Sequence, residues 1–595
     1  MNYVRSVIVA LSLLTLLAAS PILRAQQPEN SQDATLGYSI EKLNTTVRFA
    51  ADGTSERERI LVIRLESDAA VRALGVLTFT FNSENERIAV DYVRVRKRDG
   101  SVVETPESNF QETASPVTSM APMYSDLRVK QIPVRALASG DRLEYRMRVI
   151  ETKPMIANQF WYEHDFSRDT EVTEETLTVR VPAGKYIKVS NPGGEPQVRE
   201  ENGEKVYFWK TSHVAEPPQD KDRPSLRKGE ETSDQKKADG SKSDETKHSV
   251  ELTTFRTWEE VGRWYQQISG DKSAVTPLIQ AEADELTKGL ASVDEKERAV
   301  YNYVSTKFRY ISVSFGEGRY QPHAAAEVLS NLYGDCKDKH TLLAALLKAA
   351  GIEASAVLIG SDLPFNKDVP SPAQFNHVIT MIPGSSGHDV WLDATPEVAP
   401  FGLIEKPLRD HQALLVPPAG APRVVTTPAA AAVPNSQVAH FKGALDGEGT
   451  LTGHLDMTAR GDSELILRAI FHETPPAQWN ELAQRLCAGM GYGGVVNGVD
   501  IANPQDTSQA FHYGWDYKRE KYADWADLRI TAPLPSMGFP VPGDDPKTET
   551  ELGDTGEYLY DAAVRLPAGY SVDIPGPVHQ TNSFAEFEGS YSVTD

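Results

Sequence analysis

Apolar and polar residues alternate along much of the first third of the chain. Residues 93–96 read Val-Arg-Val-Arg, and residues 143–149 repeat the same two-residue period. In a strand with this period one face is buried and the other meets solvent. Turn-forming dipeptides separate the alternating runs: Asp52-Gly53, Asp99-Gly100 and Asn202-Gly203. Since such dipeptides adopt the positive backbone angles of tight hairpins, the pattern predicts an antiparallel β-sandwich over residues 37–215.

Between residues 255 and 416 the period changes and helices are expected. Thr257 and Ser292 each stand three positions before a glutamate, which is the capping box at a helix start. The apolar run at 342–347 has the length and composition of a buried helix. Three strand-like runs follow it: 354–359, 374–382 and 390–394. Helices followed by an antiparallel sheet predict an α+β domain.

Two segments have the composition of linkers. Residues 216–250 are dominated by Lys, Asp, Glu, Ser, Pro and Gly, so they bury too little apolar surface to fold and are expected to be disordered. Residues 417–436 are rich in Pro and Ala. Strand patterning then returns in residues 437–595, around one helical stretch at 478–487. Because residues 590–595 end in a strand pattern, we expect this C-terminal β-rich domain to be truncated.

Composition places the chain among soluble globular proteins. Of its 595 residues, 40% are hydrophobic and 24% are charged, and this length implies several domains. The net charge of −23 disfavours a nucleic-acid partner, since phosphate binding requires clustered basic residues that the sequence lacks.

The first residues have the pattern of a signal peptide. Arg5 lies in a short basic start, residues 7–19 are apolar, and a cleavage point precedes Gln26. Cleavage near Ser20 is an alternative. The apolar stretch is short for a membrane span, although an uncleaved anchor is a second alternative. We therefore expect residues 1–25 to be removed and the protein to be periplasmic or extracellular, without a stable span.

Cys336 is the first candidate for chemistry. It precedes the buried helix predicted at 342–347, so it should lie in the first helical turn, where unpaired backbone amides and the helix dipole favour a thiolate. A thiolate is a nucleophile for carbonyl carbon. The only other cysteine is Cys487, in a helix-like run. A disulfide would block the proposed nucleophile, and we expect Cys487 to be a buried apolar residue instead.

His377 and Asp393 supply the partners that a thiol site needs. If the loop between their strands closes a hairpin centred on Ser385, the two residues face each other directly, and Ile379 faces Trp391. Directly opposed residues of an antiparallel pair have Cβ atoms about 5 Å apart. The carboxylate then orients the imidazole and stabilises its charged form.

Neighbouring polar residues admit other interpretations. Asp335 and Asp338 place negative charge near the thiol, so a cationic partner is needed. His340 lies one helical turn after Cys336, and it could serve as the base or, with Cys336 and Asp335, as a metal ligand. Structural zinc needs three or four convergent ligands. We therefore expect His340 to pack in the helix or to support the site from behind Cys336, and no motif implies a metal or an organic cofactor.

Several motifs in residues 255–400 resemble the transglutaminase-like cysteine superfamily, in its bacterial exported branch. They are Tyr310-Ile311-Ser312-Val313, Gln321-Pro322, Gly334 to Lys339, Ala349 to Ala354, Asn376-His377-Val378 and Trp391 to Thr395. The turn motifs at Asp52-Gly53-Thr54 and Asp99-Gly100, with Ser139 to Tyr145, resemble a β-rich domain of unknown function that often precedes this core in bacteria.

The resemblance implies a papain-like α+β core in which Cys336 is the nucleophile, His377 the base and Asp393 the orienting carboxylate. The resemblance does not assign the residue that stabilises the oxyanion, and Tyr310 and Gln321 are both candidates. The implied activity is that of a peptidase, an amidase or an amide-transferring enzyme acting on peptide or protein amides, which the cell envelope offers. The alternative is a non-catalytic envelope module that retains the fold for binding.

Overall fold

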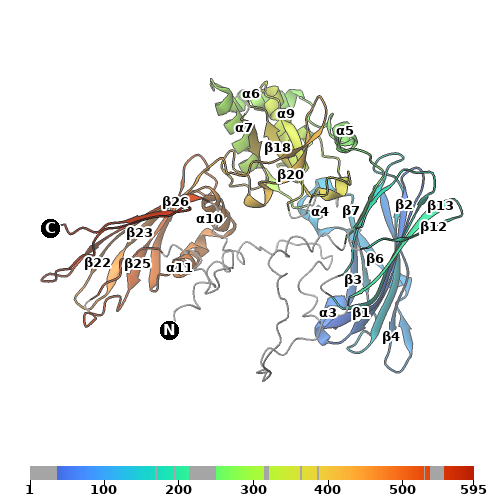
Figure 1. Ribbon diagram of the computed structural model, residues 1–595, viewed down its shortest axis with the longest axis horizontal. Helices are drawn as coiled ribbons and strands as arrows, with labels where there is room; N and C mark the ends of the chain where they lie inside the picture. The colour runs from blue at the N-terminus through green and yellow to red at the C-terminus, as the bar shows by residue number, and fades with distance from the viewer. Residues whose placement is uncertain are drawn as a thin grey trace. The chain divides into compact units, whose positions relative to one another are not determined.

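The computed structural model describes residues 37–167, 170–191, 194–213, 249–313, 320–361, 365–384, 388–527, 529–535 and 555–594 (Figure 1). The expected signal peptide and nearly all of the charged segment 216–250 lie outside these ranges. The chain divides into two compact units. One comprises the described residues up to 397 together with 404–430, and the other comprises 398–403 and the described residues from 431 onward.

The first unit begins with a large β domain. Its main sheet has eight strands in the order β12 (Gln197–Glu201), β13 (Glu204–His213), β10 (Val172–Pro182), β1 (Tyr38–Phe49), β2 (Ser55–Leu65), β8 (Arg142–Glu151), β4 (Glu86–Arg96) and β5 (Val102–Glu104). Neighbours are antiparallel except β1 and β10, which are parallel. At the turn between β12 and β13, Asn202 and Gly203 have φ of 52° and 75°, the two positive angles that the sequence predicted.

Two three-stranded sheets cover the inner face of this main sheet. One has the order β3 (Val76–Asn82), β7 (Leu127–Pro133), β6 (Gln111–Ala114), and the other β11 (Lys188–Ser190), β14 (Ser249–Thr253), β9 (Trp161–Asp165). Each packs on the main sheet through its own apolar cluster. Short helical elements complete the domain: α3 (Asp68–Leu74), η1 (Glu107–Asn109), α4 (Pro116–Met120) and η2 (Pro122–Tyr124). The predicted N-terminal β-sandwich is confirmed.

The α+β core follows in the same unit. Its helices are α5 (Trp258–Ser269), α6 (Pro277–Leu286), α7 (Val293–Lys307), α8 (Ala325–Asn331) and α9 (Cys336–Ala349). Its antiparallel sheet has the order β19 (Val390–Leu392), β18 (His377–Ile382), β17 (Ser355–Ile359), β20 (Gln412–Val416), β21 (Arg423–Thr426). Smaller elements are β15 (Arg309–Tyr310) paired with β16 (Tyr333–Gly334), η4 (Pro372–Gln374) and η5 (Lys406–Leu408). The predicted α+β class is confirmed.

The helix starts and strands of the α+β core follow the sequence predictions, with two differences. The capping box at Ser292 is complete. At Thr257 the hydroxyl accepts from the Glu260 amide, but the Glu260 carboxylate accepts from the amide of Arg256. Strand β21 lies within the range 417–436 that the sequence suggested as a linker, and it forms the edge of the sheet beside β20.

The second unit is β-rich, as predicted. Its sheet has the order β24 (Val495–Ile501), β25 (Phe511–Arg519), β23 (Leu451–Arg460), β22 (Asn435–Leu445), β26 (Gly556–Arg565), and β27 (Val578–Thr581) pairs separately with β28 (Glu586–Gly589). Helices α10 (Asp462–Glu473) and α11 (Trp479–Gly489), with η6 (Pro476–Gln478) between them, supply the other elements. Cys487 is buried in the core of this unit.

Helix α10 is an element that the sequence pattern did not predict, since only one helical stretch was expected here. Its core-facing positions include Glu464 and Arg468, which form a buried ion pair one turn apart. Charged residues at buried positions interrupt the apolar period by which a helix is identified. Among the described residues, no helix is both long and apolar enough to cross a membrane.

Candidate active site

Cys336 is the first residue of helix α9. Asp335 is the N-cap, and its side chain accepts from the amide of Asp338 at 3.2 Å. Gly334 is required for space rather than for an unusual backbone angle, because a Cβ there would lie 2.7 Å from the Cβ of Asp338. The side chain of Cys336 is 1% exposed. The sequence therefore placed the thiol correctly in the first turn of a buried helix.

His377 and Asp393 lie together as the sequence suggested. Nε2 of His377 lies 2.8 Å from Oδ2 of Asp393. The other carboxylate oxygen, Oδ1, accepts from the amide and the hydroxyl of Thr395 at 2.9 and 2.7 Å. The Tyr301 hydroxyl donates to the Asp393 carbonyl at 2.9 Å. Asp393 is thus fixed on three sides, and Thr395 and Tyr301 are orienting residues that the sequence did not identify.

The hairpin register differs from the prediction by two residues. Met381 pairs with Trp391, and Thr380 with Leu392, whereas the predicted register paired Ile379 with Trp391. A shift of two keeps every side chain on its face of the sheet, while a shift of one would have reversed them. His377 and Asp393 are consequently diagonal neighbours, and this diagonal is within reach of an imidazole and a carboxylate. The loop residues 385–387 lie outside the described part of the chain.

The Cys336 thiol lies in the same group, where it contributes with Asp393 to the electrostatic environment of His377. Since Nε2 is bound to Asp393, Nδ1 is the nitrogen that remains for the sulfur. Burial lowers the pKa of His377, but the charge and hydrogen bond of Asp393, together with Cys336, outweigh it and raise this pKa well above its usual value. For Asp393, burial raises the pKa, and His377 and Thr395 outweigh it and lower it. The site therefore favours a charged imidazolium beside the Asp393 carboxylate.

Two further carboxylates of this helix start are buried and neutralised. Asp335 forms an ion pair with Lys337, and both side chains are fully buried. Burial and the charge of Asp338 raise the pKa of Asp335 to about 6. Asp338 accepts from the His323 amide at 2.7 Å and lies 2.9 Å from Nδ1 of the same histidine. Burial raises the pKa of Asp338, but these contacts and Lys337 lower it below its usual value. The negative charge expected to oppose the thiolate is therefore largely compensated.

The β domain supplies part of this network. The hydroxyl of Tyr124, at the end of η2, donates to Oδ2 of Asp338 and accepts from the amide of Asp335, both at 2.7 Å. The neighbouring Met123 donates its amide to the Tyr333 hydroxyl at 2.9 Å, and its carbonyl lies 3.2 Å from Nε2 of His323. These contacts span about two hundred residues of sequence, so no local pattern could have revealed them.

The remaining polar residues of α9 have structural environments. His340 is buried, with Nδ1 2.8 Å from the Thr380 hydroxyl, and burial lowers its pKa to about 4. Lys339 donates to the carbonyls of Ser305 and Phe308 at 3.1 and 2.6 Å, and burial lowers its pKa to about 8. His340 is therefore buried between its helix and β18, in surroundings that disfavour its charged form. No group of three or more His, Cys, Asp or Glu side chains in the described ranges is arranged to hold a metal ion.

Tyr310 and Gln321, the two candidates for stabilising the oxyanion, have different surroundings. Tyr310 belongs to the apolar cluster that holds Cys336, and burial and then the charge of Cys336 raise its pKa. The Gln321 amide instead donates to the carbonyl of Ile268 at 3.1 Å, and its side chain is exposed. Of the two, Tyr310 is therefore the one that shares an apolar cluster with Cys336.

Removing the Tyr124 hydroxyl should weaken the domain contact at the helix start. In Tyr124→Phe the buried Asp338 loses a donor and the Asp335 amide loses its acceptor, so we expect the free energy of unfolding to fall by about 2 kcal/mol. Urea unfolding measures this. Tyr207→Phe is the control, because Tyr207 is also buried, at 7% exposure against 3% for Tyr124, and its hydroxyl has no hydrogen bond to another described residue. Equal losses in the two variants would contradict the assigned contacts.

His340 should make the protein less stable in acid. Its pKa of about 4 in the folded chain is below the usual value near 6.5, so between these pH values the unfolded chain binds a proton that the folded chain does not. Stability from this group is therefore lost as pH falls from 6.5 towards 4. In His340→Gln, the difference in unfolding free energy between pH 7 and pH 4.5 should be smaller by about 2–3 kcal/mol. An unchanged difference would show that His340 is not held neutral.

Comparison with known proteins agrees with this arrangement. Residues 51–218 match a domain of unknown function, DUF3857, and residues 280–381 match the transglutaminase-like superfamily. The second match includes Cys336 and His377. No curated protein sequence matches the chain.

Among solved structures, a protein of Parabacteroides distasonis ATCC 8503 described as a candidate protease shares 15% sequence identity. The similarity covers 81% of this chain and 93% of that one, with a TM-score of 0.55. An M1 zinc metallopeptidase of Deinococcus radiodurans is aligned over 29% of this chain and 39% of its own, with 14% identity and a TM-score of 0.18. The chain thus carries a DUF3857 domain followed by a core of the transglutaminase-like superfamily.

Proposed function

We propose that the protein is a thiol enzyme that acts on peptide or protein amides through Cys336, His377 and Asp393. The observation that carries this proposal is the position of His377, whose Nε2 lies 2.8 Å from the Asp393 carboxylate and whose pKa is raised by Asp393 and by Cys336. The superfamily match and the description of the Parabacteroides distasonis protein support a peptidase-like or amidase-like role.

The reaction begins with attack of the Cys336 thiolate on the amide carbonyl carbon. Negative charge develops on the carbonyl oxygen, where the first backbone amides of α9 are suited to donate. The His377 imidazolium then gives its proton to the leaving amine as the C–N bond breaks, leaving a thioester and a neutral imidazole. Water, deprotonated by His377, attacks the thioester and releases a carboxylic acid and the thiol. An amine in place of water would form a new amide.

Asp393 acts by holding the imidazole in position. Its second oxygen is occupied by Thr395, so the carboxylate has one orientation available towards His377. The ion pair also stabilises the imidazolium that the first step requires. We propose, from the pattern of residues 1–25, that the enzyme is exported and meets its substrates in the cell envelope.

One observation favours the alternative of a non-catalytic binding module. The Cys336 side chain is 1% exposed, so a substrate carbonyl reaches the sulfur only if neighbouring side chains move. His377, at 14% exposure, is the more accessible side of the pair. The chemical reactivity of the Cys336 thiol distinguishes the enzyme from the non-catalytic binding module.

Alkylation by iodoacetamide tests the thiol–imidazole pair. Because His377 stabilises the thiolate, we expect Cys336 to be alkylated at pH 6.5 at least tenfold faster than in His377→Ala, as measured by peptide mass spectrometry. Cys487 is an internal control, since its side chain is also 1% exposed. If Cys336 reacts only above about pH 8, as an ordinary thiol does, and His377→Ala changes nothing, the catalytic proposal fails. The protein would then be the non-catalytic binding module.

A second assay identifies the acceptor of the thioester. The protein is incubated with an unfolded protein substrate and a fluorescent primary amine, with Cys336→Ala as the control. We expect peptide bonds to be cleaved without incorporation of the amine. Incorporation that depends on Cys336 would instead make the protein an amide-transferring enzyme, and equal cleavage by Cys336→Ala would exclude the proposed nucleophile.

A further inference from the structure

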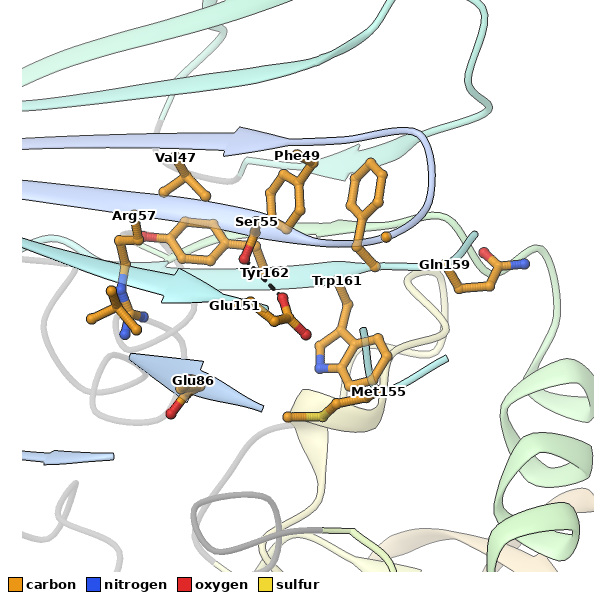
Figure 2. A pocket seen from close by; sticks show the side chains of 13 residues that line it. Val47, Phe49, Ser55, Arg57, Glu86, Glu151, Met155, Gln159, Trp161 and Tyr162 are labelled. Carbon is orange, nitrogen blue, oxygen red and sulfur yellow. Dashed lines mark hydrogen bonds between the residues drawn. The ribbon is translucent and has the colours of Figure 1, made fainter. Parts of the chain in front are cut away.

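A pocket of about 190 Å³ lies in the β domain, outside the proposed active site (Figure 2). Its lining residues come from β1, β2, β4, β8 and β9 and from the segment before β9. Phe49, Arg57, Glu151, Met155, Phe160 and Trp161 are among them. The volume is below that of pockets for drug-sized ligands, so the pocket suits a ligand about as large as one amino-acid residue.

Arginine 57 points into the interior of the β domain. Along β2, the odd-numbered Ile63 and Leu65 are buried in the core while Arg64 is exposed, so Arg57 and Arg59 lie on the inner face. Figure 2 shows the Arg57 side chain at one end of the pocket, beside Tyr162. Within the described residues, Arg57 forms no hydrogen bond through its side chain and no ion pair within 4.0 Å.

No neighbouring group supplies an ion-pair partner for Arg57 within the described residues. Nε of Arg59 is buried without a hydrogen bond, and so is the hydroxyl of Thr45, the residue opposite Arg59 on β1. Glu86 and Glu151 favour the charge on Arg57, but they do so from beyond ion-pair distance. Burial and the charge of Arg59 outweigh them and lower the pKa of Arg57.

The outer face of the same sheet provides a direct contrast. Of the six arginines on β4 and β8, five are bound to a carboxylate: Arg94, Arg96, Arg142, Arg146 and Arg148. The sixth, Arg87, is exposed to solvent. The sheet therefore has ample means of pairing arginines, yet the two inner ones lack such pairs in the described part of the chain. Arg57 and Arg59 are half-buried. A guanidinium partly removed from water without an anion is unfavourable, and such arginines are usually matched to a carboxylate or a phosphate.

The rest of the pocket restricts what the anion can be. Phe49 and Phe160 stack with their ring centroids 4.1 Å apart, and Met155 and Trp161 extend the apolar wall. Glu151, held by the Ser55 hydroxyl at 2.8 Å, is the acidic residue that Figure 2 places between Arg57 and Trp161. Its charge disfavours a ligand with a second negative group.

We propose that this pocket binds a single carboxylate carrying a compact apolar group, as at the C-terminal residue of a peptide or in a free amino acid. The carboxylate pairs with Arg57, with Arg59 adjacent, and the apolar group lies against the Phe49–Phe160 pair. Trp161 joins the pocket to the core, since its ring also packs against Trp264 and Tyr320, with centroids 5.4 and 5.6 Å apart.

Calorimetric titration of the full chain tests this site independently of catalysis, because the Cys336→Ala variant is used throughout. The probes are acetyl-Ala-Leu with a free carboxylate, its C-terminal amide and free leucine. We expect the acid to bind at least tenfold more tightly than the amide, and Arg57→Gln to weaken the acid at least tenfold. Arg64→Gln, on the exposed face of the same strand, should bind as the parent does. Tighter binding of free leucine than of the acetylated dipeptide would identify the free amino acid as the source of the carboxylate.

Thermal unfolding without ligand separates binding from a structural role. Because Arg57 has no ion-pair partner to lose, Arg57→Gln should unfold at the same temperature as the parent or at a higher one. Unfolding several degrees lower would make Arg57 a structural residue and overturn the proposal. Equal binding of the acid and the amide, or no binding of either at millimolar concentration, would also overturn it.

Discussion

The start of helix α9 depends on compensating buried charges. Asp335 and Asp338 are both removed from water, and an unpaired buried carboxylate would cost several kcal/mol. Lys337 pairs with the first, while His323 and Tyr124 bind the second. Because Tyr124 belongs to the DUF3857 domain, this domain helps to set the position of Cys336. The β domain is therefore a structural part of the proposed catalytic site rather than a separate module beside it.

Much of the proposed site could be predicted because its signals are local. A cysteine before a buried apolar run identifies a helix start, and the two-residue period of β18 and β19 fixes which side chains share a face. That parity explains why His377 and Asp393 meet even though the predicted register was wrong by two residues. The alternation of strands and the turn dipeptides in the β domain are local signals of the same kind.

The parts that could not be predicted depend on distant residues. Tyr124 and His323 carry no local mark of their contact with Asp338, since a hydrogen bond across the fold leaves no period in the sequence. Helix α10 was missed because its buried Glu464–Arg468 pair interrupts the apolar pattern. Strand β21 was taken as a linker because a short edge strand after Pro and Ala residues has too few positions to show alternation.

The charged segment that the sequence analysis assigned to a linker connects β13 to β14. Strand β13 belongs to the main sheet and β14 to the small sheet that packs on it, and both contribute to the same apolar cluster. The two ends of the segment are therefore anchored within one domain, and it does not set the spacing between the β domain and the core. Evolution could lengthen, shorten or recode this insert, and an engineer could place a tag or a reporter there, without altering the distance from Tyr124 to Cys336.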